Sequence, residues 1–66
     1  MMFIQRQFKL ISGSFDYQYV SSVDSRGYPT GYDKHIKYAL NLSEWHLKRT
    51  IKFFDYIGAK YVTSLS

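Results

Sequence analysis

The order of apolar and polar residues predicts one element above all, an amphipathic helix over residues 41–57. At about 100° of rotation per residue, several residues fall within one narrow stripe. They are Leu47, Ile51, Phe54 and Gly58, with Thr50 and Ile57 at the margin. Such a stripe is typical of a helix that covers a hydrophobic core on one side only. We therefore expect this side of the helix to hold the fold together.

The ends of this helix are also signalled in the sequence. Asn41 or Ser43 can act as the N-cap, because a short polar side chain accepts a hydrogen bond from a free amide of the first turn. Asn41 followed by Glu44 three residues later resembles a capping box. Gly58 suits the left-handed residue with which helices commonly end.

Alternation of apolar and polar residues predicts strands around the helix. Residues 3–11 and 14–23 alternate on either side of a glycine-containing turn, which is typical of a β-hairpin. Residues 34–40 and 60–65 are expected to form a third and a fourth strand. Residues 24–33 hold the single proline and two glycines, and we expect a loop there. These elements predict an α+β fold, in which one helix packs on a three- to four-stranded, mainly antiparallel sheet in β-β-β-α-β order.

Two features of the predicted hairpin indicate which of its side chains face the core. Arg6 interrupts the inner row of the first strand, which suggests an edge strand or a side chain whose stem lies along apolar surface. Phe15, Tyr17 and Tyr19 share one face of the second strand. We expect these rings to face the core, and the alternative is a platform on which nucleic-acid bases stack.

Length and composition limit the chain to a single domain, residues 1–66, and exclude several kinds of site. There is no cysteine, so no disulfide and no thiolate metal site can form, and His35 and His46 match no metal-ligand spacing. We recognise no catalytic or phosphate-binding motif, so we expect no enzyme, no metal and no cofactor. Phe, Tyr and Trp make up 20% of the chain, more than so small a core needs, so some rings are expected to contact a partner.

The positive charge is confined to one half of the chain. Residues 1–33 balance three Lys or Arg with three Asp, whereas residues 34–66 carry six cations and two acids, which accounts for the whole net charge of +4. A one-sided positive field favours acidic partners. We expect the acidic surface of a larger protein, with DNA or RNA as the alternative, and the surplus rings also allow a homodimer.

The expected contact surface is the helix face opposite the apolar stripe, joined by two lysines of the predicted third strand. Aromatic and basic residues four positions apart, such as Trp45 and Arg49, can form cation–π pairs on this face. The alternative is a solvated face whose rings pack against neighbouring loops, but that explains three large rings less well than it explains the cations. The predicted partner-binding residues are Trp45, Lys48, Arg49, Lys52, Phe53, Tyr56, Lys34 and Lys37.

The sequence shows neither a membrane span nor a signal peptide. No stretch approaches the ~20 apolar residues that a spanning helix needs, and charged residues interrupt the N-terminal apolar positions. We therefore expect a cytoplasmic, non-catalytic interaction module of the regulator or inhibitor type.

Overall fold

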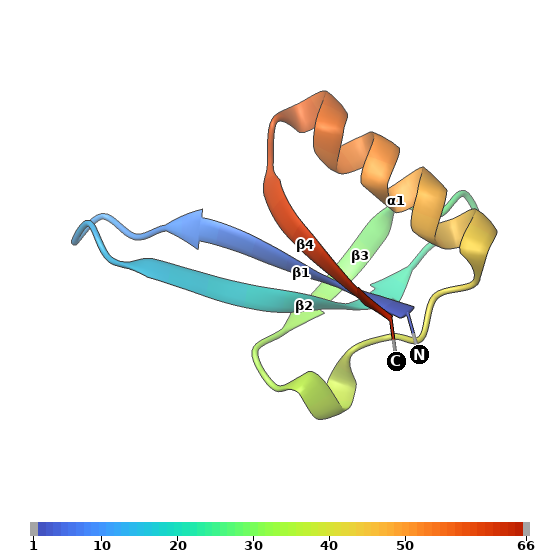
Figure 1. Cartoon of the computed structure of the whole chain (residues 1–66), viewed down its shortest axis with the longest axis horizontal. Helices are drawn as coiled ribbons and strands as arrows, with labels where there is room; N and C mark the ends of the chain where they lie inside the picture. Colours follow the sequence, from blue (N-terminus) through green and yellow to red (C-terminus); the bar gives the residue numbers. More distant parts are fainter. Residues whose placement is uncertain (1, 66) are drawn as a thin grey trace.

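A four-stranded antiparallel sheet and one long helix make up the fold, in a computed structural model that describes residues 2–65 (Figure 1). The strand order is β3-β2-β1-β4, so the predicted α+β class and the β-β-β-α-β order are confirmed. The elements are β1 (Met2–Lys9), β2 (Phe15–Val23), β3 (Pro29–Asp33), the 3-10 turn η1 (Ile36–Tyr38), α1 (Glu44–Ile57) and β4 (Lys60–Leu65).

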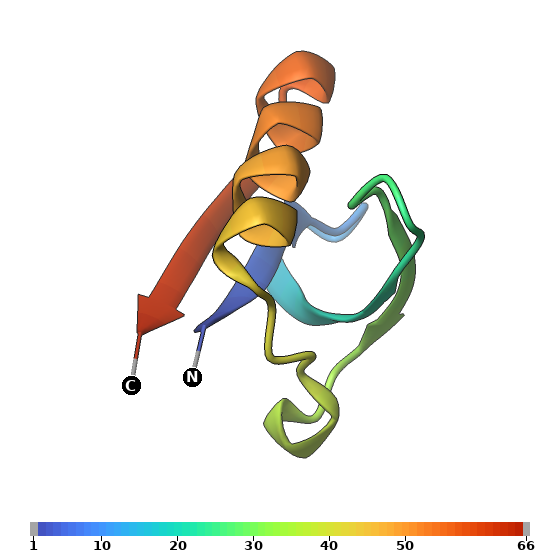
Figure 2. The ribbon, with the colours of Figure 1, turned by 90° about the vertical axis from the view of Figure 1, so that its right-hand side faces the viewer.

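The segment from η1 to the end of α1 carries the chain from one edge of the sheet to the other. β3 forms one edge, and β4 forms the opposite edge beside the central strand β1 (Figure 2). In the register of the sheet, Gln5 of β1 lies opposite Tyr19 of β2 and opposite Val62 of β4. The first and last strands of the fold are therefore direct neighbours.

The core lies between the helix and one face of the sheet. Ile4 of β1, Val20 of β2 and Phe54 of α1 are fully buried, and Leu42, just before the helix, closes the same cluster. These side chains come from four separate parts of the chain. The core therefore fixes the helix against the two central strands.

The predicted apolar stripe of the helix faces this core, but its residues are buried to different depths than expected. Leu47 and Ile51 pack against the core cluster but are only half-buried, whereas Thr50 is fully buried. The Thr50 hydroxyl lies 2.5 Å from the Gly27 carbonyl oxygen and 2.8 Å from that of His46. A buried threonine is tolerated here because its polar atom has these partners.

The residues that cap the two ends of the helix are largely those predicted. The Ser43 side chain accepts a hydrogen bond from the His46 amide at 3.2 Å and is the N-cap. The capping box predicted from Asn41 is wrong, because the Asn41 side chain accepts from the Met2 amide instead. Gly58 takes the left-handed conformation, with φ of 70°, and ends the helix as expected.

The third strand was predicted in the wrong place. Within residues 34–40 the chain forms η1, because the Asp33 carboxylate accepts a hydrogen bond from the His35 amide at 2.8 Å and turns the chain out of the sheet. The strand itself, β3, lies in the predicted loop and begins at Pro29. β3 is an edge strand, where proline at the first position is tolerated. The loop between strands is thus reduced to residues 24–28.

The rings of β2 do not form the core face that we expected. Val20 is the core residue of β2, and since side chains alternate along a strand, Tyr19, Tyr17 and Phe15 point to the opposite face. Tyr19 is buried there against the Phe3 ring, with the centroids 5.7 Å apart. Tyr17 and Phe15 are 41% and 72% exposed.

The edge position considered for Arg6 is also wrong. Arg6 belongs to β1, which pairs with β2 on one side and β4 on the other. Its guanidinium carbon lies 4.5 Å from the centroid of the Tyr32 ring and 5.3 Å from that of Phe8. Stacking on these rings allows a cation on the core side of a central strand.

Candidate functional site

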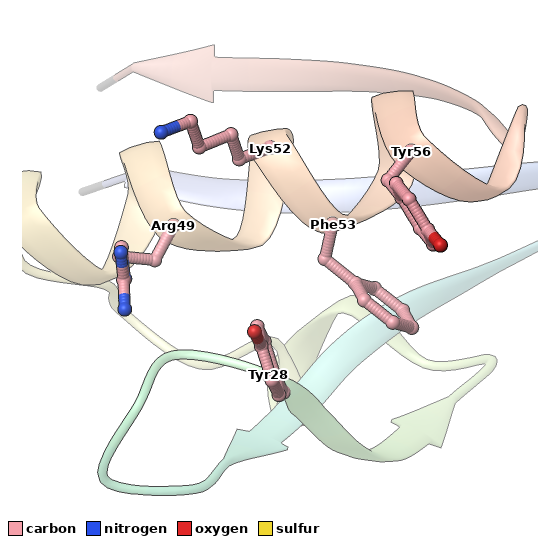
Figure 3. A pocket seen from close by; sticks show the side chains of 5 residues that line it. All are labelled: Tyr28, Arg49, Lys52, Phe53 and Tyr56. Carbon is pink, nitrogen blue, oxygen red and sulfur yellow. The ribbon is translucent and has the colours of Figure 1, made fainter.

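A pocket of about 330 Å³ lies between the helix and the 24–28 loop (Figure 3). Four of its five lining residues were predicted as partner-binding residues, and the fifth comes from the loop. No Asp or Glu lines the pocket. The lining residues are Tyr28, Arg49, Lys52, Phe53 and Tyr56.

The loop reaches the helix through bare backbone at Gly27. Gly27 is buried with φ of 87°, and a Cβ atom there would lie only 2.7 Å from the Cβ of Arg49. Its carbonyl oxygen accepts the hydrogen bond from Thr50, and the Arg49 Nε donates to the Arg26 carbonyl oxygen at 3.4 Å. Only glycine permits this approach, because any side chain would separate the loop from the helix.

Hydrogen bonds to Asp24 hold the 24–28 loop in its conformation. Its carboxylate accepts hydrogen bonds from the amides of Arg26 and Tyr28, each at 2.9 Å, and its carbonyl oxygen accepts from the Gly27 amide at 3.0 Å. The hydrogen bond from the Tyr28 amide, followed by those of Arg26, lowers the pKa of Asp24. The charged carboxylate therefore fixes the backbone position from which the Tyr28 ring contacts the helix.

The lowered pKa of Asp24 leads to a prediction about the loop. Since this pKa is lower in the folded than in the unfolded chain, the ionised side chain stabilises the fold above pH ~4, and this contribution is lost as the pH falls through the folded-state value. In an NMR titration, the amide shifts of Arg26 and Tyr28 are expected to change together, with a midpoint below the ordinary Asp value. Asp24→Asn keeps an acceptor oxygen and should remove this transition. A midpoint at the ordinary value would contradict the proposed role of Asp24.

The aromatic residues of the predicted surface have different surroundings. Phe53 is half-buried, and its ring centroid lies 5.4 Å from that of Tyr28. Tyr56 is 90% exposed and Trp45 is 53% exposed. Packing against a neighbouring loop thus accounts for Phe53 but leaves two large rings facing solvent.

The cations of the helix face are held to different degrees. The guanidinium carbon of Arg49 lies 5.3 Å from the Trp45 ring centroid, as the spacing predicted. Lys48 forms an exposed ion pair with Glu44 at 3.3 Å. Lys52 has no ion-pair partner within residues 2–65. Arg49 and Lys52 therefore give the pocket an uncompensated positive charge.

The two lysines predicted from the third strand lie elsewhere. The Lys34 Nζ pairs with the Asp16 carboxylate of β2 at 3.2 Å, and the Lys37 Nζ lies 5.0 Å from the Tyr38 ring centroid in η1. Hydrogen bonds from the Tyr17 amide and from Lys34 lower the pKa of Asp16. Figure 1 shows the 36–38 turn on the other side of the sheet from α1. The structure does not bring these lysines to the pocket.

Tyr28 is the lining residue that the predicted set lacks. Helical rotation places residues on a helix face but says nothing about which loop meets that face. The sequence signal that points to this residue is Gly27 directly before it, followed by the single proline at position 29.

Comparison with known proteins gave no further assignment of the site. A scan against protein-family models, a search of curated proteins and a search of solved structures found no match. Within the described residues, no helix combines the length and the apolar character needed to cross a membrane.

Proposed function

We propose that this chain is a non-catalytic protein-interaction module, which binds the acidic surface of a larger protein through the pocket and the exposed helix face around it. The observation that carries the proposal is the combination of two cations and three rings around one pocket with no acidic residue in its lining. Trp, Tyr and Arg are the residues in which binding energy concentrates at protein interfaces.

The arrangement of the pocket supports an acidic side chain as its occupant. Arg49 and Lys52 offer charge-assisted hydrogen bonds, and the rings offer apolar surface on which the stem of a Glu side chain can pack. Arg49 is already oriented by the Trp45 ring and the Arg26 carbonyl group, so less side-chain entropy is lost when it binds.

A protein partner fits the rings better than nucleic acid does. Stacking of bases requires free ring faces, but Phe53 and Tyr28 pack against each other. On the helix face this leaves only the exposed rings of Tyr56 and Trp45 for bases. Direct binding to DNA or RNA is the competing outcome of the test, and it has a clear signature. Three to five phosphate contacts give a binding constant that falls roughly 40- to 500-fold between 50 and 200 mM salt.

A photo-crosslinking amino acid in place of Tyr56 tests the proposal. Tyr56 is 90% exposed beside the pocket, so we expect crosslinks to an acidic protein in nuclease-treated lysate of the source organism. The same amino acid in place of Tyr38 in η1 is the control, because Tyr38 is exposed but distant from the helix. Crosslinks only to nucleic acid, or equal crosslinking at both positions, would reject the proposal.

Reversal of two charges on the helix gives a second prediction. Lys48→Glu combined with Lys52→Glu should leave stability within about 0.5 kcal/mol for each change, because both side chains are exposed. Capture of the crosslinked partner should be lost, because acidic groups of the partner would meet new negative charge.

The reversal has a matched control in the other two predicted lysines. Lys34→Glu combined with Lys37→Glu changes the net charge equally, at positions that do not line the pocket. We expect this variant to keep most of the binding. Equal loss in both double variants would show that only the overall charge matters and that the pocket is not the site.

A further inference from the structure

The C-terminal end of β1, around Lys9, carries a second surface feature outside the proposed helix site. The β1–β2 hairpin projects beyond the start of β4 (Figure 1). β1 pairs with β4 only as far as Gln7, opposite Lys60, whereas it pairs with β2 as far as Lys9, opposite Phe15. The outer edge of β1 is therefore open just beyond the start of β4.

The backbone of Lys9 faces this open edge. The Leu10 amide donates to the Ser14 carbonyl oxygen at 2.8 Å, so the polar groups of Leu10 point toward β2. Backbone groups of successive residues in a strand point to opposite sides. The amide and carbonyl groups of Lys9 thus point outward, and no backbone partner for them is found in the described part of the chain.

A pocket of about 580 Å³ surrounds this edge. It exposes both faces of the sheet, and each face contributes at least one cation and one ring. Arg6 and Phe8 lie on the helix side, and Lys9, Lys60 and Phe15 lie on the other side. No acidic residue lines the pocket.

The Arg6 guanidinium group adds to the positive charge of this pocket. Its side chain is half-buried between the rings of Tyr32 and Phe8, and its Nε is buried without a hydrogen-bond partner. Within residues 2–65 its guanidinium group has no carboxylate partner either. The part of the guanidinium group that lines the open pocket is therefore free to form a charge-assisted hydrogen bond with an anion from outside.

We propose that this edge pocket binds an extended acidic segment of a partner protein, which lies beside β1 as a short continuation of the β4 position. The free backbone groups of Lys9 would pair with the main chain of the segment. Its carboxylates would meet Arg6 on one face and Lys9 with Lys60 on the other, and its apolar side chains would cover Phe8 and Phe15. Charge complementarity selects an acidic occupant, and the open strand edge selects an extended one.

The peptide acetyl-Thr-Val-Glu-Glu-Val-Thr-amide is a suitable probe, because it places one acid and one apolar side chain on each face of a strand. In NMR spectra recorded at low salt with peptide at about 1 mM, shifts are expected in the Lys9 amide and in the Arg6 Nε–H resonance. The peptide with Gln in place of Glu should produce neither shift.

Charge-neutralising variants locate the binding. Lys9→Gln combined with Lys60→Gln should weaken binding of the acidic peptide by about 10-fold, since charge-assisted hydrogen bonds are lost. Lys48→Gln combined with Lys52→Gln removes the same charge from the helix face and should have no effect. The helix pocket can therefore fail its own test without affecting this one.

Three results would overturn the inference. The first is the absence of shifts at Lys9 and Arg6, or equal shifts with the Gln peptide. The second is equal binding of a peptide with methylated backbone nitrogens, which would exclude strand addition. The third is the same pattern of shifts from acetate at equal carboxylate concentration, which would show a site for small anions instead of a peptide segment.

Discussion

Phe54→Ala is expected to unfold the protein. Phe54 is fully buried in the cluster with Ile4 and Val20, and its ring also lies 5.7 Å, between centroids, from that of Tyr61 on β4. Truncation of a buried Phe costs ~3–5 kcal/mol, and a core of this size supplies a net ~3–5 kcal/mol. Little or no free energy of unfolding should remain, as judged by far-ultraviolet circular dichroism and urea titration.

A second variant of the same helix separates core packing from helix propensity. Tyr56→Ala removes a ring that is 90% exposed and should change stability by no more than about 0.5 kcal/mol. If Phe54→Ala instead unfolds cooperatively at a urea midpoint close to that of Tyr56→Ala, the core does not depend on Phe54.

Gly27→Ala is expected to separate the 24–28 loop from the helix. The new Cβ would meet the Cβ of Arg49 at 2.7 Å, and this atom cannot move aside as the end of a flexible side chain can. The positive φ adds roughly 1–2 kcal/mol, and overpacking adds ~1–3 kcal/mol. We expect a total loss of about 2–5 kcal/mol in urea denaturation, together with loss of the ring contact between Tyr28 and Phe53 in NMR spectra.

Gly13→Ala is the matched control for this experiment. Gly13 has φ of 93°, close to the 87° of Gly27, but a Cβ atom there would meet nothing within 4 Å. Only the cost of the positive φ applies, so the free energy of unfolding should fall by roughly 1–2 kcal/mol. The difference between the two variants measures the contact between loop and helix. Equal losses would mean that the loop adapts freely and that Gly27 does not fix the pocket.

The helix could be predicted because its signals are local. The stripe that ends in Phe54, the cap at Ser43 and the stop at Gly58 all depend on residues within a few positions of one another. For the same reason, helical rotation correctly grouped Arg49, Lys52 and other pocket residues on one face.

The hairpin faces and the third strand depend on distant contacts, and there the predictions failed. Alternation identifies two faces of β2 but not which of them meets the helix, and the single residue Val20 decides this. Residues 34–40 alternate as a strand would, but the Asp33 side chain turns them out of the sheet. Tyr28 joins the site only because Gly27 lets the loop touch the helix, which no local pattern records.

The pairing of β1 with β4 sets the order in which the sheet can form. The register joins Met2 to Leu65 and Gln7 to Lys60, so nearly the whole described chain lies between the paired residues. Contacts of such long sequence separation form late and slow folding, whereas the β1–β2 hairpin closes over a short turn. During folding, the central strand β1 is therefore an edge strand for a time, open to pairing with other chains until β4 covers it. Pairing with β4 thus protects β1 from aggregation, and in the described residues β1 stays unpaired on that side only around Lys9, while β3 and β4 form the edges of the sheet.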